Sequence, residues 1–563
     1  MVKGTQEFES GSQEPSTGIF PDENPQLIDT QLSGESSATV QEGLEHHRSG
    51  DFKKAAEVYA QVIKNEPSNC DAHALLGAVS LKEGHFNDAE FLINKAIKIC
   101  PGRHQFHYNL GAVYRKLSKF DDALQEYNRA LEIKPDYGLA YGGLGDAYFA
   151  LENYVDALLN YKEALTHCET PDILNGLGLV LTRFGKHDAA AEAYIKALKI
   201  DPDRHEIYSN LGELLRLQGK MEASVQAYST ALSLRPELDV IRWNRAFPRL
   251  MSGDVSGGWD DYEAGLRSFN RHPIDFGVER WGGETDLSEK CVAVGLEQGL
   301  GDELLFGTCY PDLHERAKTL ILSCDPRLEK LWQRRFPDAW VLPVTKQERA
   351  KGTWELPSLY PRPEVQVAAG SLPSHFRRSL RDFNSAEPIL FPDRGLAEKW
   401  QTRVGALPQG LKVGISWRSS HMTVRRSWNY LVEDSLLRLL DISGVTFVNL
   451  QYDATGEELS ELSHQGGLTV FDWEDLDQFN DLEQVVALIG QLDLVISVPS
   501  APSRLASATG QRCWRIEHQH FSSMGCDVHP FFNNTRLWRY GDFADTNELI
   551  DAMKEEIEQQ ILD

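Results

Sequence analysis

Glycine recurs at a nearly fixed interval through the first half of this chain of 563 residues. Successive glycines lie 34, 34, 34, 33 and 34 residues apart, at Gly43, Gly77, Gly111, Gly145, Gly178 and Gly212. Twelve residues after each glycine stands a small residue: Ala55, Ala89, Ala123, Ala157, Ala190 or Ser224. Small residues let two antiparallel helices approach closely, and a proline near the end of most units stops the second helix. The period therefore predicts stacked helix pairs.

Aromatic residues share this period. Five units place a tyrosine four residues after the small residue, at Tyr59, Tyr127, Tyr161, Tyr194 and Tyr228. The second unit instead has Phe91, two residues after Ala89. We expect these six rings to fill the space between helix pairs. The pattern resembles the tetratricopeptide repeat (TPR), whose period it matches.

The repeats predict an all-α TPR solenoid over residues 36–270, with six to seven repeats. The seventh unit is degenerate and runs from about Asp239 to Arg267, where Trp243 and Trp259 break the pattern as expected of a capping repeat. Residues 1–35 are rich in Ser, Gly, Glu, Gln and Pro and are predicted to be a disordered tail, because they cannot bury enough apolar surface to offset chain entropy.

The second half of the chain has a different pattern. All 12 tryptophans lie at or after Trp243, and short apolar runs alternate with amphipathic stretches. Alternating strands and helices indicate parallel sheets. A proline-rich stretch from Pro343 to Pro392 divides this half into two predicted Rossmann-like lobes that face a cleft, residues 271–395 and 396–563, the second ending in a helix. The predicted strands are Cys291–Leu296, Thr319–Ser323, Lys412–Trp417, Val445–Leu450, Leu468–Phe471 and Asp493–Val498.

The composition excludes several classes of partner. Lys and Arg total 57 and Asp and Glu total 84, so the net charge is −27 and a general nucleic-acid surface is excluded. The longest apolar run, Val485 to Val498, is interrupted by Gln491 and Asp493, so no membrane span is predicted. Eight cysteines without a C-x-x-C pair, and no secretory signal, predict reduced thiols in a cytoplasmic protein.

Three motifs in the second half could hold a ligand. The first, GLEQGLGDE, follows a predicted strand and opens a predicted helix. Its Gly299 and Gly301 allow a sharp turn in front of the helix N-terminus, which favours anions, and Asp302 would stand at the lip of the cleft. The alternative is an ordinary strand–helix turn with Asp302 as the N-cap.

The other two motifs also follow strands. Residues 413–428 carry Arg418, Arg425 and Arg426 within nine positions, and arginine suits phosphate recognition. The alternative is a solvated loop whose arginines pair with nearby acids. Residues 492–510 lead from a strand through Ser500 and Ser503 into a helix that could cradle a diphosphate, or that simply forms a tight junction.

These motifs, in this order after TPR repeats, resemble bacterial TPR proteins with a C-terminal glycosyltransferase-like region. That region is similar to the two-lobed GT-B fold of lipopolysaccharide heptosyltransferases and, more distantly, the tandem is similar to protein O-GlcNAc transferase and flagellin glycosyltransferases. The resemblance implies Asp302 as catalytic base, and Arg418, Arg426, Ser500 and Arg504 around the donor diphosphate. Two residues depart from the family motif: Pro499 stands where Asp is common, and Arg504 where His is.

The implied function is transfer of a sugar from a nucleotide-sugar co-substrate, without metal or other cofactor, to a protein bound by the TPR groove. Asn109, Asn210 and Asn244 share one position in three units and resemble an asparagine ladder that grips a peptide backbone. The alternative for them is consensus usage. The competing function is a TPR scaffold with a degenerate transferase domain; action on lipopolysaccharide is less favoured, because it leaves the repeats without a role. A homo-oligomer is compatible with the repeats.

Overall fold

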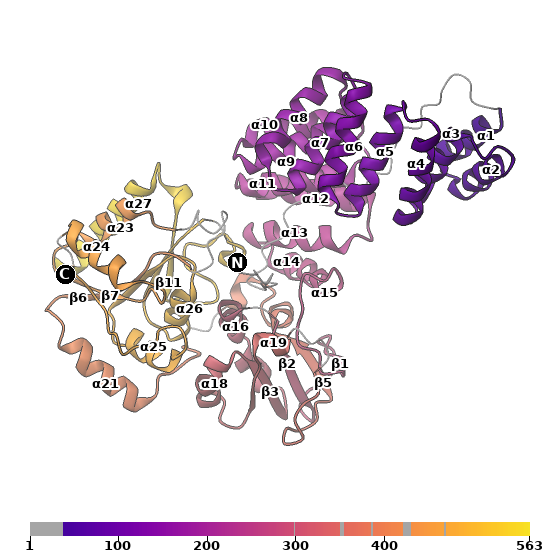
Figure 1. The fold of residues 1–563 in the computed structure, drawn as a ribbon. Helices are drawn as coiled ribbons and strands as arrows, with labels where there is room; N and C mark the ends of the chain where they lie inside the picture. The colour runs from indigo at the N-terminus through magenta and orange to yellow at the C-terminus, as the bar shows by residue number, and fades with distance from the viewer. Residues whose placement is uncertain are drawn as a thin grey trace. The chain divides into compact units, whose positions relative to one another are not determined.

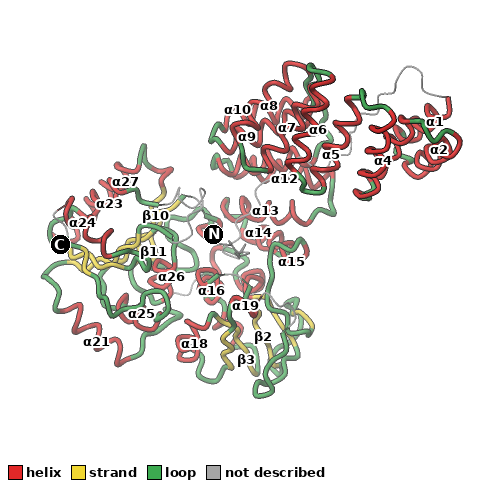
Figure 2. Tube along the Cα trace, in the orientation of Figure 1, coloured by secondary structure: helices red, strands yellow, loops and turns green. Residues whose placement is uncertain are grey.

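The computed structural model describes residues 38–297, 299–349, 354–383, 387–419, 430–466, 469–518 and 520–562. Internal contacts divide these residues into two units, residues 38–237 and residues 238–562. The first unit is built of helices, and the second contains two sheets (Figures 1 and 2). The two units are described separately below.

The first unit consists of six helix pairs, as the glycine period predicts. The first helices of the pairs are α1 (Ala38–Arg48), α3 (Cys70–Lys82), α5 (His104–Lys116), α7 (Gly138–Ala150), α9 (Pro171–Arg183) and α11 (His205–Leu217). The second helices are α2 (Phe52–Asn65), α4 (Phe86–Ile99), α6 (Phe120–Ile133), α8 (Tyr154–His167), α10 (His187–Ile200) and α12 (Met221–Leu234). Five of these second helices end two residues before a proline, which confirms the predicted stop signal.

Each periodic glycine lies under a side chain of the second helix in its own pair. A Cβ at Gly111 would come within 2.7 Å of the Tyr127 ring, and one at Gly145 within 2.7 Å of the Tyr161 ring. The predicted role of the five tyrosines is therefore confirmed: all are buried. Phe91 is the exception, because its side chain is 68% exposed while Ile93, four residues after Ala89, is buried against Gly77. The spacing after the small residue, and not aromaticity, decides which side chain is buried.

Two cysteines in the second helix pair form a disulfide. Cys70 opens α3 and Cys100 follows the last residue of α4, so the bond joins the two ends of one pair. The prediction of eight reduced thiols is therefore wrong for these two, and the six other cysteines are free. Disulfides persist in oxidising compartments, so the cytoplasmic location stays a prediction that the cysteines no longer support.

The degenerate seventh pair packs with the second unit. It comprises α13 (Asp239–Met251) and α14 (Val255–Tyr262), followed by the short α15 (Ala264–Arg267). Trp243, Phe247 and Tyr262 belong to the hydrophobic core that also contains Phe306 and Phe531. The boundary between the two units thus lies between residues 237 and 238, whereas the repeat period predicts that the solenoid ends at residue 270. The small positions of the repeat are kept here as Ala246 and Gly258, and the aromatic side chains of Trp243, Phe247 and Tyr262 bind this pair to the C-terminal core.

The first sheet has five parallel strands in the order β1-β5-β2-β3-β4. Helices cover one face, and the segments around Phe276 and Tyr360 cover the other. The strand β5 lies inside the proline-rich stretch that the sequence places between the lobes, so that stretch belongs largely to the first sheet. The strands are β1 (Glu279–Arg280), β2 (Cys291–Gly295), β3 (Thr319–Cys324), β4 (Trp340–Pro343) and β5 (Val365–Ala368). The helices are α16 (Leu300–Gly307), α17 (Tyr310–His314), α18 (Glu329–Arg335), α19 (Lys346–Arg349) and α20 (Leu372–Phe376).

The second sheet has six parallel strands in the order β11-β10-β9-β6-β7-β8. Numbered from its first strand, this is the order 6-5-4-1-2-3 of a Rossmann sheet. Helices lie on both faces (Figure 1). The strands are β6 (Leu411–Ser416), β7 (Val445–Asn449), β8 (Val470–Phe471), β9 (Leu494–Ser497), β10 (Cys513–Glu517) and β11 (Thr535–Arg539). The helices are α21 (Arg394–Gly405), α23 (Glu433–Leu440), α24 (Gly456–Gly466), α25 (Leu482–Ile489), α26 (Ala501–Ala508) and α27 (Thr546–Leu562).

Candidate functional site

The second sheet changes direction of chain progression between β6 and β9, and three serines gather at the carboxyl ends of these strands. Open parallel sheets bind ligands at such a switch point. Ser500 Oγ lies 2.9 Å from Ser497 Oγ and 3.5 Å from Ser416 Oγ. Ser500 is also the N-cap of α26, in a reciprocal capping box with Ser503. The predicted donor residue Ser500 is therefore at the switch point, with its hydroxyl among other hydroxyls.

The loop after β6 is held by side chains that follow β7. Gln451 Oε1 accepts hydrogen bonds from the backbone N–H groups of Trp417 and Arg418, both at 3.0 Å. The Arg418 guanidinium donates to Asp453 and, at 2.7 Å, to Glu458. Arg418 thus pairs with nearby acids, as the alternative interpretation of this loop expected. Arg425 and Arg426 lie outside the described residues.

The equivalent switch point of the first sheet, between β2 and β5, is occupied by an ion pair of the protein itself. Arg271 donates to both carboxylate oxygens of Glu297, at 2.8 and 2.9 Å, and both side chains are almost completely buried. Arg271 also donates to Ser371 at 3.0 Å and to Glu263 at 3.0 Å. Glu297 follows β2 and Ser371 follows β5, so this network closes the first switch point.

The GLEQGLGDE motif opens α16, as predicted, and the first residue of that helix is Leu300. Gly299 is the N-cap, and Asp302 lies inside the first turn, so the alternative of Asp302 as N-cap is wrong. Asp302 is buried. At Gly299, no described atom lies within 4 Å of where a Cβ would be, and the backbone φ is negative; neither packing nor conformation demands a glycine. At Gly301 a Cβ would touch Arg504 Cγ at 3.6 Å.

Glu303, next to Asp302 in the sequence, has a structural environment of its own. Its carboxylate accepts hydrogen bonds from Trp332 Nε1 at 2.8 Å and from the backbone N–H of Asp325 at 2.9 Å. Burial raises the pKa of Glu303 to about 8, more than these two hydrogen bonds lower it. The sequence motif therefore contains two acids with different surroundings, and the Glu303 carboxylate is directed into the core of the first lobe.

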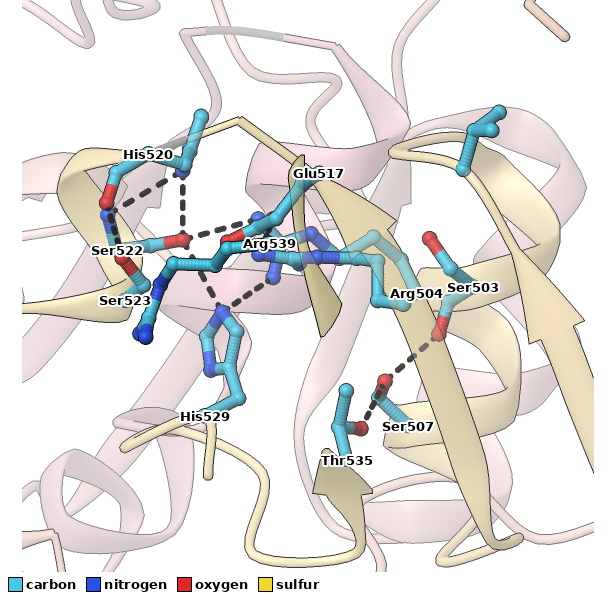
Figure 3. A network of polar contacts seen from close by, with 12 residues as sticks. Ser503, Arg504, Ser507, Glu517, His520, Ser522, Ser523, His529, Thr535 and Arg539 are labelled. Atoms are coloured by element: carbon cyan, nitrogen blue, oxygen red, sulfur yellow. Dashed lines mark hydrogen bonds and ion pairs between the residues drawn. The ribbon is translucent and has the colours of Figure 1, made fainter. Parts of the chain in front are cut away.

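Arg504, predicted to contact the donor diphosphate, lies in a buried polar network at the start of α26 (Figure 3). Its Nη1 is 2.9 Å from Nε2 of His529, and its Nη2 donates to Ser522 Oγ at 3.3 Å. Ser522 Oγ is also 3.0 Å from His529 Nε2 and 2.8 Å from His520 Nδ1. No sequence pattern indicates His529, and the spacing of His520 from His518 predicts no site.

Electrostatics set Arg504 apart from the other arginines of this unit. Burial and the neighbouring Arg515 lower the pKa of Arg504 to about 9, while Asp302 and Glu517 oppose that effect. Arg515 forms an ion pair with Glu517, and both side chains are almost completely buried on β10. The charged form of Arg504 is thus destabilised where it lies. An anion placed beside it would stabilise that form.

The three predicted peptide-binding asparagines are buried. Asn109 and Asn210 lie on α5 and α11 of the first unit, and Asn244 lies on α13 of the second. Asn210 Nδ2 donates to Asn175 Oδ1 at 2.9 Å, which links α11 to α9. The repeat alignment missed Asn175, because it stands three residues before its glycine and the other three asparagines stand two before theirs or the equivalent position. Peptide binding by these amides stays a prediction.

Ion pairs connect the first helices of successive pairs. Arg103 lies 3.2 Å from Asp71, Arg115 lies 3.1 Å from Asp146, and Arg204 lies 2.5 Å from Asp172. Each of these pairs is largely buried. Charged side chains therefore line the first helices of the solenoid in paired form.

Neither a membrane helix nor a metal site occurs in the described part of the chain. No helix there is both long and apolar enough to cross a membrane. Across the same residues, no cluster of three or more His, Cys, Asp or Glu side chains is placed to hold a metal ion.

Comparison with known proteins agrees with the helical structure of the first unit. Tetratricopeptide-repeat family models match residues 40–104, 103–170 and 175–239. Protein FlbA of Caulobacter vibrioides is 26% identical over 395 residues, which cover 67% of this chain and just under two thirds, 66%, of FlbA.

Among solved structures, the APC/C hetero-tetramer Cut9-Hcn1 is 17% identical, with a TM-score of 0.39 over 42% of this chain and 46% of that one. The TPR protein TTC0263 of Thermus thermophilus is 22% identical, with a TM-score of 0.30 over 31% of this chain and 97% of that one. The helix pairs, the buried glycine–tyrosine contacts and the family matches all indicate tetratricopeptide repeats in the N-terminal region. Residues 40–239 carry tetratricopeptide repeats, and the chain as a whole is similar to FlbA.

Proposed function

We propose that the second unit is a glycosyltransferase of the GT-B type, which uses a nucleotide sugar and modifies a protein presented by the TPR region. One observation carries the proposal. The helix that bears Asp302, in the first lobe, packs against the helix that bears Arg504, at the switch point of a Rossmann-ordered sheet in the second lobe. An acid and a destabilised cation from two lobes thus meet where a Rossmann sheet binds ligands.

The chemistry would be a single displacement with inversion. An acceptor hydroxyl of the bound protein attacks the anomeric carbon of the sugar, and its proton passes to the Asp302 carboxylate. The bond between that carbon and the phosphate oxygen breaks, and the nucleoside diphosphate leaves. Arg504, together with the N-terminus of α26 and the Ser500 hydroxyl, would stabilise the negative charge that develops on the leaving group.

Asp302→Asn tests the catalytic role, because asparagine keeps the shape of the side chain and cannot accept the proton. We expect transfer to fall about 10²- to 10⁴-fold, the usual contribution of a general base, with nucleotide binding retained. Asp338→Asn, at an exposed aspartate of the same unit, is the control. Transfer at the wild-type rate by Asp302→Asn would remove this residue from the mechanism.

A ligand screen tests the donor site directly. A nucleotide or nucleotide sugar at about 100 times its Kd adds about 2.7 kcal/mol of stability to the unit that binds it. Because all 12 tryptophans lie in the second unit, selectively excited tryptophan fluorescence follows the unfolding of that unit alone. We expect one nucleotide family to raise its melting temperature by several degrees.

A second candidate function is a TPR scaffold whose transferase-like unit does not catalyse. The specific observation in its favour is that both described arginines of the predicted donor site already have partners: Arg418 binds Asp453 and Glu458, and Arg504 binds His529 and Ser522. A scaffold predicts that no nucleotide stabilises the second unit and that Asp302→Asn leaves partner binding unchanged. The screen above separates the two functions.

A further inference from the structure

Among the polar residues that the predicted donor site does not use, His529 has the most specific contacts. It lies after β10 in the sequence, in the loop that leads into β11, and its imidazole faces Arg504 of α26 (Figure 3). We propose that His529 is a positioning residue that holds Arg504 in the orientation needed to bind the leaving diphosphate, and that it does so only as the neutral imidazole. The inference rests on the proposed function and adds a pH dependence to it.

The hydrogen-bonding capacity of the two groups decides the form of the ring. A guanidinium can only donate, so the His529 Nε2 that lies 2.9 Å from Arg504 Nη1 must accept and cannot carry a proton. The ring proton is then on Nδ1, which has no hydrogen-bond partner among the described residues. A second proton on Nε2 would set an N–H against the N–H of Arg504 and break the contact.

The charges around the ring oppose its protonation. Arg504 on α26, Arg515 on β10 and His520 from the preceding turn all face it, and each would repel an imidazolium. Glu517 is the nearby acid on β10, but it is paired with Arg515. Complete burial, followed by these cations, lowers the pKa of His529 well below its usual value.

The backbone around His529 is held by hydrogen bonds, so its contact with Arg504 depends little on loop motion. The His529 N–H donates to the Thr535 carbonyl at 2.9 Å, and Phe532 N–H donates back to the His529 carbonyl at 3.0 Å. Phe531 packs with its ring centroid 4.7 Å from that of Phe383. A rigid acceptor directs the planar fork of a guanidinium better than a mobile one would.

Arg504 is therefore held on one side by His529 and Ser522, and on the other its stem lies beside the start of α16, where a Cβ at Gly301 would touch it. The family motif that this region resembles has histidine where Arg504 stands. Here an imidazole is supplied 25 residues later in the chain and acts through the arginine.

Two substitutions separate positioning from packing. His529→Gln places an amide oxygen where Nε2 was, so it can accept from Arg504 but cannot become charged. His529→Leu fills similar space without an acceptor. His314→Gln is the matched control, since His314 is a partly exposed histidine of the same unit that pairs with Asp338 at 3.0 Å. The full chain is used throughout, and binding is measured by calorimetry with the nucleoside diphosphate that the ligand screen identifies.

At pH 7.5 we expect His529→Leu to weaken diphosphate binding about 10- to 100-fold, as for loss of a hydrogen bond to a charged group, and His529→Gln to restore most of it. As the pH falls below 6.5 and His529 takes up a proton, wild type and His314→Gln should lose affinity more steeply than His529→Gln. Ionisation of the ligand phosphate changes all variants equally, so only this difference reports His529.

Two results would overturn this inference and leave the proposed function standing. One is wild-type affinity in a folded His529→Leu variant, and the other is the same pH dependence of affinity for wild type and His529→Gln. Should His529→Leu not fold, the comparison of wild type with His529→Gln still decides the question. If wild type binds no nucleotide at all, the proposed function fails and this inference fails with it. The failures are therefore distinguishable.

Discussion

Replacing Ile93 by alanine should destabilise the TPR unit far more than replacing Phe91, two residues earlier on the same helix. The Ile93 side chain is completely buried, and removing three carbons forfeits about 0.8 kcal/mol for each, or about 2.4 kcal/mol. The cavity left against Gly77 raises the expected loss to about 3–4 kcal/mol, within the range for large-to-small core substitutions. Phe91 is 68% exposed, so Phe91→Ala should cost about 0.5–1 kcal/mol.

Urea unfolding of the full chain can test this with two probes. Far-UV circular dichroism follows both units, whereas tryptophan fluorescence follows only residues 238–562, since no tryptophan precedes Trp243. Ile93→Ala should shift the transition seen by circular dichroism and leave the fluorescence transition in place. Equal effects of Ile93→Ala and Phe91→Ala would refute the reasoning, because Phe91 would then contribute as much to packing as Ile93, as its grouping with the five tyrosines by aromatic character predicts.

Two further predictions concern buried charges of the second unit. Burial raises the folded-state pKa of Glu303 to about 8, so the stability that protonated Glu303 contributes is complete below about pH 4.5 and is lost as the pH rises to about 8. Over that range the free energy of unfolding should fall by about 1.4 kcal/mol per pH unit, the slope for one proton. Fluorescence-monitored unfolding between pH 5.5 and 7.5 should show this slope, and Glu303→Gln should remove it. Arg271→Met should cost about 3–5 kcal/mol by leaving Glu297 buried without its cation, and Arg271→Met/Glu297→Leu should recover part of this; a cost under about 1 kcal/mol for the single variant would contradict the assignment of that ion pair as buried.

Most of the regular structure could be predicted from the sequence, because its periods are strong. The 34-residue spacing located all six helix pairs of the first unit, and the six predicted strands agree with the structure to within one or two residues. Two of the missed strands, β10 and β5, lack a continuous apolar run. β10 is buried along its whole length yet carries Arg515 and Glu517, and β5 has four residues within a stretch rich in proline.

The candidate site was predicted less well, because its partners are distant in the sequence. Ser500 was found because it follows a strand and Arg504 because the family resemblance implies it, and the structure brings Arg504 close to the helix of Asp302. His529 and Ser522 contact Arg504 from 25 and 18 residues away, in a loop with no local signature. The pairing of Cys70 with Cys100 had no sequence signal either, because spacing alone does not give the end-to-end contact of a helix pair.

The packing of α13–α14 decides where this chain can be cut. A fragment that begins at residue 271, after the last repeat by sequence, would lack Trp243, Phe247, Trp259 and Tyr262. It would expose the rings that those residues cover, including Phe306, Phe521 and Phe531. Such an apolar surface promotes aggregation. An expression fragment meant to isolate the second unit should therefore start before Leu238 and retain a helix pair that looks, from its sequence, like part of the other half.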